Sequence, residues 1–183
     1  MKARDKVLIV DDSDINRSLL ADMLAQDYDL VEAANGLEAV ALLSQQYSEI
    51  SLVLLDIVMP MMDGFEVLAS MNKSGYIDHI PVIMISAETS SVYIDHAYDL
   101  GAAEYISRPF DEKTVKRRVK NTIMLYAKQK YLENMVTEQL LEKEKNNLVM
   151  VEILSHIVEF RNGESGLHVM HIRVITEALL KQL

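Results

Sequence analysis

Three carboxylates in the first third of the chain have the chemistry of metal ligands. Asp11 and Asp12 directly follow the apolar run VLIV, and Asp56 directly follows the apolar run LVLL. Carboxylates that lie close together repel one another unless a cation joins them, and hard oxygen ligands in a small, partly hydrated site favour Mg²⁺. Asp11, Asp12 and Asp14 could instead be ordinary capping and loop acids. Two adjacent acids matched by a third nevertheless favour a cation site.

A second group of candidate metal ligands lies near the end of the sequence, in the segment FRNGESGLHVMH at residues 160–171. If residues 164–183 are helical, Glu164, His168 and His171 are spaced i, i+4 and i+7 and share one helix face. Apolar residues flank this line on both sides, so the three polar groups lie within a face that should be buried. They need partners there, and either a bound metal or ordinary hydrogen bonds would supply them.

The first three carboxylates must be positioned by a regular alternation of strands and helices. Short apolar runs predict strands at 6–10, 28–33, 51–56, 81–86 and 103–107. Helical spacing predicts one helix that begins with Asp14 as its N-cap, and further helices at 36–47, 64–73 and 89–100. This alternation predicts an α/β fold in which helices cover both faces of a parallel five-stranded sheet. Ligands of such sheets bind beyond the carboxyl ends of the strands, so the acids converge if strands 6–10 and 51–56 are neighbours.

The remainder of the chain has a different pattern. Residues 111–160 contain neither Gly nor Pro and predict one helix of about fifty residues, roughly 75 Å long. One register with alternating steps of three and four passes through Leu132, Val136, Gln139, Lys143, Asn146, Met150, Ile153, Ile157 and Phe160. This register is apolar at both ends and polar in the middle, which favours a coiled coil and hence a homodimer. The alternative is a helix that lies on a further domain.

Composition excludes several classes of function. The net charge is −10 and is unevenly distributed: residues 1–110 carry 18 acidic and 6 basic side chains, whereas residues 111–183 carry 10 and 12. The acidic first part argues against nucleic-acid binding, and the basic stretch KTVKRRVK at 113–120 reads as a solvated helix face. The chain has no cysteine, no signal-peptide pattern and no stretch long enough to span a membrane. We therefore expect a cytoplasmic protein that binds neither nucleic acid nor membrane.

Four motifs in the alternating region occur in an order that is typical of one family. They are VLIVDDS, LVLLDIVMPMMDGFEVL, PVIMISA and YISRPF. Together they resemble the receiver domain of two-component response regulators, over residues 1 to about 125. The resemblance implies a flavodoxin-like (βα)5 fold and a phosphoryl group accepted on Asp56 from a sensor histidine kinase or phosphotransfer protein. It also implies that Asp11, Asp12, Asp56 and the backbone carbonyl of Val58 hold Mg²⁺.

The same resemblance assigns three residues that would respond to the phosphoryl group. Ser86 takes the position of the switch hydroxyl, and Tyr105 takes that of the switch aromatic residue. Arg108 stands where the family usually has lysine, and the exchange is not conservative because a guanidinium is longer, planar and forked. Arg108 could pair with Asp56 or with the phosphoryl group, or it could point outward. With arginine in this position, a receiver that does not switch and serves only as a dimerisation scaffold is an alternative.

The tail resembles a second family. EFRNGESGLHVMHIRVITEALL is similar to the opening helices of HD-GYP-type phosphohydrolases, which cleave cyclic di-GMP at a multi-metal centre. The resemblance covers about residues 150–183 and implies that Glu164 and His168 are metal ligands, whereas His171 has no clear assignment. The family's further ligands do not follow, so this chain cannot complete the metal centre and is not expected to be an enzyme. The apolar pattern is interrupted at Leu183, which suggests a piece of a longer regulator, with a cyclic-di-GMP phosphodiesterase as the alternative reading of that parent.

We accordingly predict three parts. Residues 1–125 form a receiver domain, residues 111–160 form a helical linker that continues its last helix, and residues 161–183 begin an incomplete HD-GYP-like helical domain. Phosphorylation of the first part would act through the dimerising helix on a C-terminal output. We also expect the final helix to be poorly ordered or to pack against a neighbouring chain, because nothing in this sequence covers its apolar face.

Overall fold

Five short apolar runs form one parallel β-sheet in the computed structural model, which describes residues 4–87, 90–162, 174 and 176. The strands are β1 (Lys6–Val10), β2 (Asp29–Ala33), β3 (Ile50–Asp56), β4 (Val82–Ser86) and β5 (Glu104–Ser107). They lie in the order β2-β1-β3-β4-β5, and every neighbouring pair is parallel. The central strands β3 and β4 are almost wholly buried, which explains their continuous apolar sequences. The predicted flavodoxin-like α/β fold is confirmed.

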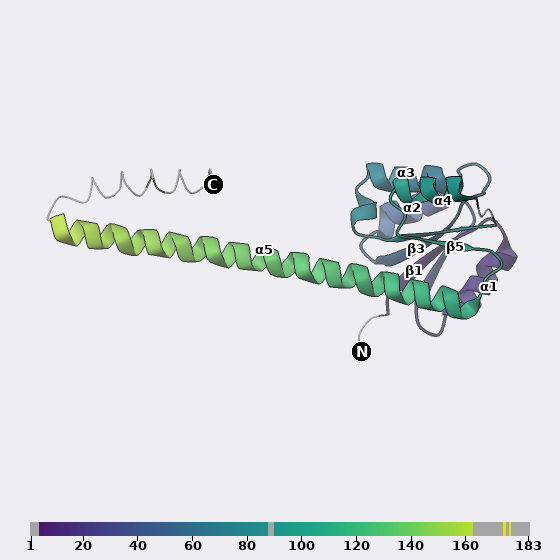
Figure 1. The fold of residues 1–183 in the computed structure, drawn as a ribbon, viewed down its shortest axis with the longest axis horizontal. Helices are drawn as coiled ribbons and strands as arrows, with labels where there is room; N and C mark the ends of the chain where they lie inside the picture. The colour runs from purple at the N-terminus through teal and green to yellow at the C-terminus, as the bar shows by residue number, and fades with distance from the viewer. Residues whose placement is uncertain (1–3, 88–89, 163–173, 175, 177–183) are drawn as a thin grey trace. The chain divides into compact units, whose positions relative to one another are not determined.

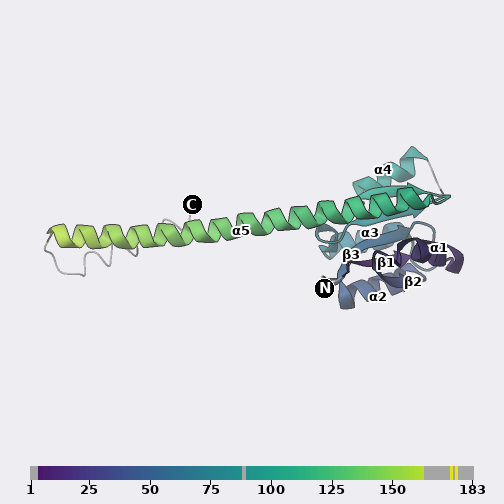
Figure 2. The same cartoon turned by 90° about the horizontal axis from the view of Figure 1, so that it is seen from below.

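Helices cover both faces of this sheet (Figure 1). They are α1 (Asp14–Leu24), α2 (Gly36–Gln46), α3 (Gly64–Lys73), α4 (Ser91–Asp99) and α5 (Glu112–Asn162), with a short 3-10 helix, η1 (Tyr76–Asp78), that was not predicted. One buried cluster joins the sheet to α2, α3 and α4, and the other joins it to α1 and the first turns of α5. The view from below shows α1 and this first part of α5 on the same side of the sheet (Figure 2). Successive side chains of β1 alternate between the two clusters, as the period of a strand requires.

Short polar side chains set the starts of the helices next to the candidate site. Asp63 caps α3 in a capping box, in which its carboxylate accepts from the Glu66 amide at 2.8 Å. The prediction that Asp14 caps α1 is wrong, because the N-cap is Ser13, whose hydroxyl accepts from the Asn16 amide. Asp14 is instead the first helical residue and pairs with Arg17 one turn later. The predicted fourth helix begins at Ser91, later than expected.

Contacts within the chain divide it into two units, residues 1–130 and residues 131–183. Helix α5 is continuous over 51 residues, close to the predicted 111–160. In the second unit, five apolar side chains of the predicted coiled-coil register are at least half exposed in the single chain, namely Leu132, Val136, Met150, Ile153 and Ile157. None of the helices in the described ranges combines the length and the apolar character that crossing a membrane needs.

Candidate functional site

The pairing of β1 with β3 brings the three carboxylates together. Val10 lies opposite Leu55 in the sheet, so the residues that follow them, Asp11 and Asp56, meet at the carboxyl edge. One ligand atom from each of Asp11, Asp12 and Asp56 lies within 4.8 Å of the others. Asp11 and Asp56 are buried and Asp12 is exposed, so the cluster opens to solvent on one side. Three hard oxygen donors this close together fit a small divalent cation such as Mg²⁺.

Arg108 points into this cluster. Its Nη2 contacts Asp11 Oδ2 and lies 3.0 Å from Asp56 Oδ1, so one nitrogen bridges two buried carboxylates. The guanidinium carbon lies 5.7 Å from the centre of the Phe110 ring, within the range of a cation–π contact. Among the described residues, the Arg108 Nε is a buried donor with no hydrogen-bond partner. Of the orientations left open by the sequence, the structure therefore has the inward one.

The Asp56 carboxyl has an unusual affinity for protons. Burial raises its pKa from the ordinary value of 3.8 to about 6, and the nearby Asp11 charge acts in the same direction. The Arg108 guanidinium opposes both and lowers the pKa, as does the Ile57 amide, which donates to Asp56 Oδ1 at 2.9 Å. Asp56 is thus mainly ionised at neutral pH, although its pKa lies only about one unit below neutrality.

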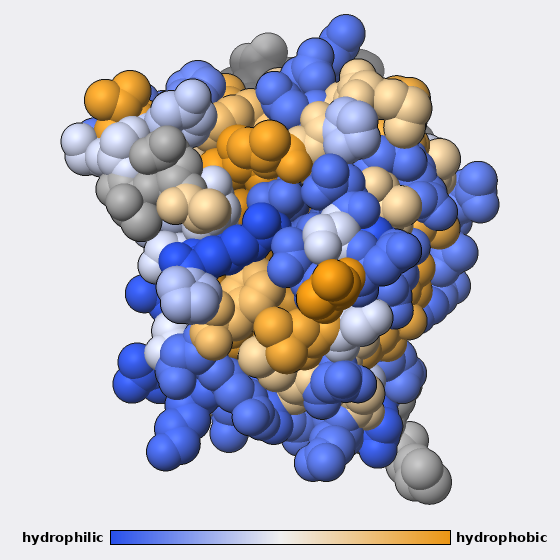
Figure 3. All heavy atoms as spheres, turned by 90° about the vertical axis from the view of Figure 1, so that its right-hand side faces the viewer, coloured by the Kyte–Doolittle hydropathy of each residue, from blue (hydrophilic) through white to orange (hydrophobic). Residues whose placement is uncertain are grey.

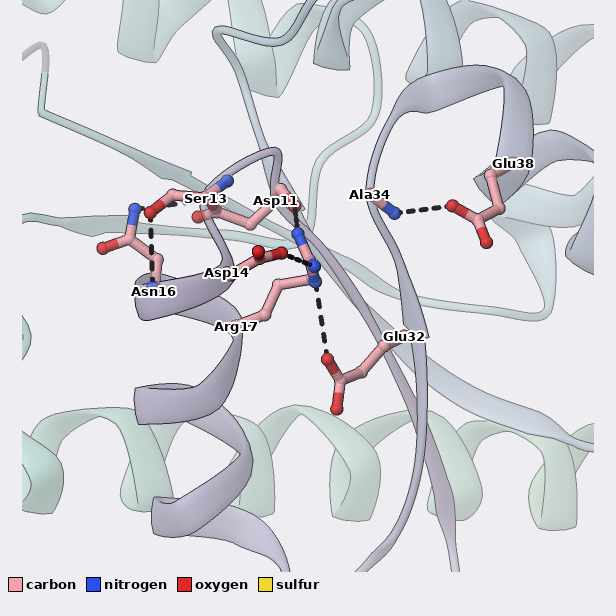
Figure 4. A network of polar contacts seen from close by, with 8 residues as sticks. All are labelled: Asp11, Ser13, Asp14, Asn16, Arg17, Glu32, Ala34 and Glu38. Atoms are coloured by element: carbon pink, nitrogen blue, oxygen red, sulfur yellow. Dashed lines mark hydrogen bonds and ion pairs between the residues drawn. The ribbon is translucent and has the colours of Figure 1, made fainter.

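The Asp11 carboxylate is held on both of its oxygens. Its Oδ1 accepts from the Ser13 amide at 2.9 Å and from the Asn16 side-chain amide at 3.2 Å, while its Oδ2 contacts Arg108. Figure 4 shows the first two of these donors at the start of α1. Asp11 therefore ties the β1–α1 loop to the segment after β5.

Arg17 is a functional candidate that sequence reasoning missed. From α1 it reaches three acceptors: the Asp11 carbonyl oxygen at 2.6 Å from Nη1, the Asp14 carboxylate, and Glu32 Oε2 on β2 at 3.4 Å from Nε (Figure 4). Its side chain is 13% exposed. The i, i+3 spacing from Asp14 could have indicated one of these contacts. The contact with Glu32 depends on the pairing of β1 with β2, whereas the contact with the Asp11 carbonyl lies within the β1–α1 segment and depends on the path of the loop between β1 and α1.

The β3–α3 loop packs tightly behind Asp56. The Gly64 amide donates to the Ile57 carbonyl at 2.9 Å, and a Cβ at position 64 would overlap the Asp56 carbonyl oxygen. Met61 in this loop has a φ of 69°, a left-handed conformation that non-glycine residues rarely adopt. Val58 is 71% exposed, and the role of its backbone carbonyl as a metal ligand stays a prediction.

The predicted switch residues lie on the neighbouring strands. Ser86 ends β4, is buried, and its carbonyl accepts from the Arg108 amide at 2.9 Å. Tyr105 on β5 is also buried, and Arg118 Nη1 donates to its carbonyl at 2.6 Å and pairs with Glu104. A pocket of about 510 Å³ lies here, and its lining includes Ile94, Tyr98, Glu104, Tyr105, Thr114 and Arg118. The switch roles stay predictions, and those of Glu164 and His168, like the unassigned His171, lie outside the described residues.

Comparison with known proteins identifies the class. The family model described as the response regulator receiver domain matches residues 7–120, which is more than half of the chain. The chain therefore belongs to this family and contains the receiver domain of a two-component response regulator. Receiver domains are phosphoryl acceptors rather than enzymes, bind Mg²⁺ at an acidic pocket and interact with histidine kinases or phosphotransfer proteins. The acidic cluster at Asp11, Asp12 and Asp56 fits that description by its position and donor set.

Individual relatives extend the comparison. A probable cyclic di-GMP phosphodiesterase of Vibrio cholerae is 32% identical over 97% of this chain, which spans 41% of the length of that relative. Among solved structures, the chemotaxis protein CheY4 of Vibrio cholerae is 28% identical with a TM-score of 0.61, over 66% of this chain and 99% of that one. The CheX-CheY-BeF3-Mg+2 complex of Borrelia burgdorferi gives 34% identity and a TM-score of 0.60, over 65% of this chain and 89% of that one.

Proposed function

We propose that this chain is a cytoplasmic response regulator that accepts a phosphoryl group on Asp56 from a sensor histidine kinase or a phosphotransfer protein. The observation that carries the proposal is the buried Asp56 carboxylate at the carboxyl end of β3, flanked by two further acids and one inward guanidinium. The family match supports the same role. Residues 1–125 would be the receiver, residues 111–160 the linker, and residues 161–183 the beginning of the output domain.

The transfer requires an ionised carboxylate as nucleophile. An Asp56 oxygen attacks phosphorus, the bond from phosphorus to the donor's imidazole nitrogen breaks, and the imidazole leaves as the neutral ring after taking up a proton. Oδ1 is engaged by the Ile57 amide and by Arg108, so we assign the attack to Oδ2. Mg²⁺ held by Asp11, Asp12, Asp56 and the Val58 carbonyl would neutralise charge on the phosphoryl oxygens.

Residues of the neighbouring strands β4 and β5 would respond to the resulting acyl phosphate. The Ser86 hydroxyl at the end of β4 would donate to a phosphoryl oxygen, which draws the β4–α4 loop toward Asp56. Tyr105 would then move inward from the wall of the pocket that Glu104 and Arg118 also line. A change in that pocket alters the surface formed by α4, β5 and the start of α5.

Exposed apolar side chains next to the acids support docking of a kinase or phosphotransfer partner. Ile15 is 80% exposed at the start of α1, and Val58 and Met61 in the β3–α3 loop are both 71% exposed. The end of the molecule where α1 begins and β5 gives way to α5 carries apolar side chains amid hydrophilic ones (Figure 3). Of the apolar positions of the predicted helix, Ile15 and Leu19 are therefore exposed at the surface, while Leu20 and Leu24 are buried in the core.

The output is proposed to be reached through a homodimer. The exposed apolar positions of α5 beyond residue 130 would be covered by the same helix of a second copy, with the polar positions between them weakening the centre. Phosphorylation would alter this association or its register.

A second candidate concerns the longer protein of which this chain would be the first part. The alignment with a probable cyclic di-GMP phosphodiesterase covers 97% of this chain and therefore includes most of the tail. A parent with that activity would use Glu164 and His168 as metal ligands, completed by residues that lie beyond this chain.

Incubation with acetyl phosphate and Mg²⁺ tests the proposed function. Intact-mass measurement should show the addition of one phosphoryl group, which disappears in the matched Asp56→Asn chain and in the presence of a chelator. A chain that gains no such mass at neutral pH would instead be the non-switching scaffold.

A further inference from the structure

One nitrogen atom of Arg108 occupies the position between two carboxylates that a shared cation would need. Nη2 contacts Asp11 Oδ2 and lies 3.0 Å from Asp56 Oδ1. A divalent ion bound to both of these oxygens must also lie between them, because Mg²⁺ to oxygen distances are only about 2.1 Å. The guanidinium and the metal would then be close neighbours of like charge, which is unfavourable in a partly buried site.

We infer that Arg108 is an internal counter-ion that competes with Mg²⁺ for Asp11 and Asp56, so that metal binding requires the guanidinium to leave at least one of these carboxylates. The inference rests on the proposed metal site and adds a residue that sets its affinity. Because the two cations share the same oxygens, each weakens the binding of the other by the same factor.

Burial supports this role. The side chains of Asp11 and Asp56 are only 1% and 2% exposed, whereas that of Arg108, which contacts both, is 23% exposed. Two carboxylates taken out of water need a cation beside them, and Arg108 supplies it without any metal. The ion pairs with Arg108 therefore hold both carboxylates without a metal, and a metal that binds must displace at least one of these pairs.

The surroundings of Arg108 allow the displaced guanidinium to take other positions. The face of Phe110 holds it on one side at 5.7 Å, and a cation–π contact of this kind is compatible with several positions of the guanidinium. Its buried Nε has no hydrogen-bond partner among the described residues. An arginine that leaves one nitrogen unsatisfied in the paired state can gain a hydrogen bond when it moves, for example to a phosphoryl oxygen.

Calorimetric titration of the full chain with Mg²⁺ tests the competition. Arg108→Met, which keeps an unbranched apolar side chain and removes the charged guanidinium, should bind Mg²⁺ more tightly than the wild type by a factor between about 5 and 100. Arg108→Lys keeps a competing charge and should gain less. Arg4→Met makes the same change in net charge at the opposite end of β1 and should leave the affinity unchanged. Equal or weaker binding by Arg108→Met would overturn the inference.

A second measurement needs no variant to fold. In the wild-type chain the ¹⁵N–¹H signal of the Arg108 Nε should shift during the Mg²⁺ titration with the same midpoint as the heat, while the Arg4 signal stays in place. Metal binding without any change at Arg108 contradicts the competition and leaves the proposed function intact. If the Arg108→Met chain binds Mg²⁺ and the wild-type chain does not, the competition is supported, because the guanidinium then excludes the metal completely. If neither chain binds Mg²⁺, the metal site and the competition both fail.

Discussion

Burial and pairing act in opposite directions on the Asp56 carboxylate. Loss of water raises the pKa to about 6, against the Arg108 guanidinium and the Ile57 amide, which lower it. Between the ordinary value of 3.8 and about 6, the folded chain binds more protons at this residue than the unfolded chain does. Ionisation of Asp56 therefore costs stability as the pH rises through this window, and the nucleophile is held in a less stable, more reactive state.

We expect the carboxyl carbon of Asp56 to titrate in the NMR spectrum with a pKa of about 6 when divalent cations are removed by a chelator. Arg108→Met should raise this pKa further, because the guanidinium lowers it. Mg²⁺ should lower it, since the metal binds the ionised form. A value close to 4 in the metal-free chain would show that Asp56 is more hydrated than the structure implies.

Stability should follow the same titration. Relative to Asp56→Asn, the wild-type chain should lose up to about 3 kcal/mol of unfolding free energy between about pH 4 and pH 7, the equivalent of a pKa raised by about two units. Urea unfolding of both chains in chelator measures the difference. A difference that does not depend on pH would refute it.

At the scale of elements, two arginines act on the two ends of Asp11. Arg17 binds its backbone carbonyl from α1, and Arg108 binds its carboxylate from the segment after β5. The charge of Arg17 is already balanced by Asp14 and Glu32, so its effect on the acids is mainly to position the β1–α1 loop. The two residues should therefore influence metal affinity with opposite signs.

Arg17→Met should weaken Mg²⁺ binding several-fold, whereas Arg108→Met strengthens it. It should also cost about 1–3 kcal/mol of stability, because hydrogen bonds to charged groups are lost. Arg17→Lys, which can keep only part of the contacts, should lie between Arg17→Met and the wild type. Calorimetry and thermal unfolding of the same samples separate the two effects. A lower melting temperature with unchanged Mg²⁺ affinity would limit Arg17 to a structural role.

The junction of β3 with α3 depends on the lack of a side chain at Gly64. A Cβ there would overlap the Asp56 carbonyl, which belongs to rigid backbone. Gly64→Ala should cost about 3 kcal/mol and shift the end of β3. Gly75→Ala is a matched comparison, because its Cβ meets open space and only the φ of 70° is unfavourable, at about 1–2 kcal/mol. Chemical unfolding of both variants compares these costs, and equal losses would contradict the close approach.

For the molecule as a whole, the second unit raises the question of what covers its apolar positions. Val136 and Ile153 lie in the predicted register and are 55% and 54% exposed in the single chain. Val136→Asp with Ile153→Asp should convert the proposed dimer to a monomer in analytical ultracentrifugation, because buried charges oppose the helix pairing. Asn134→Asp with Thr137→Asp adds the same charge outside the register and should leave the dimer intact. A wild-type chain that sediments as a monomer would exclude this interface.

The secondary structure and the acidic cluster of this protein could be predicted from its sequence. Over the part of the chain that the structure describes, strand runs and helix periods predicted the five strands and five α-helices to within a few residues, because these patterns report which faces of each element are buried. The motifs also indicated Asp11, Asp12 and Asp56 as neighbours, since acids after adjacent parallel strands must share an edge. The cap of α1 was misplaced by one residue, because Ser13 and Asp14 are both good N-caps and Arg17 engages the second.

Only the tertiary structure decided how the charges pair. Whether Arg108 turns inward, and that one of its nitrogens bridges Asp11 and Asp56, depends on how β1, β3 and β5 are ordered and how far the chain after β5 reaches. The contact of Arg17 with Glu32 likewise requires β1 and β2 to be neighbours. Local sequence determines backbone conformation and which faces are buried. A long charged side chain can instead pair with any of several partners that are far apart in the sequence, and only the packed sheet brings particular partners within reach of it.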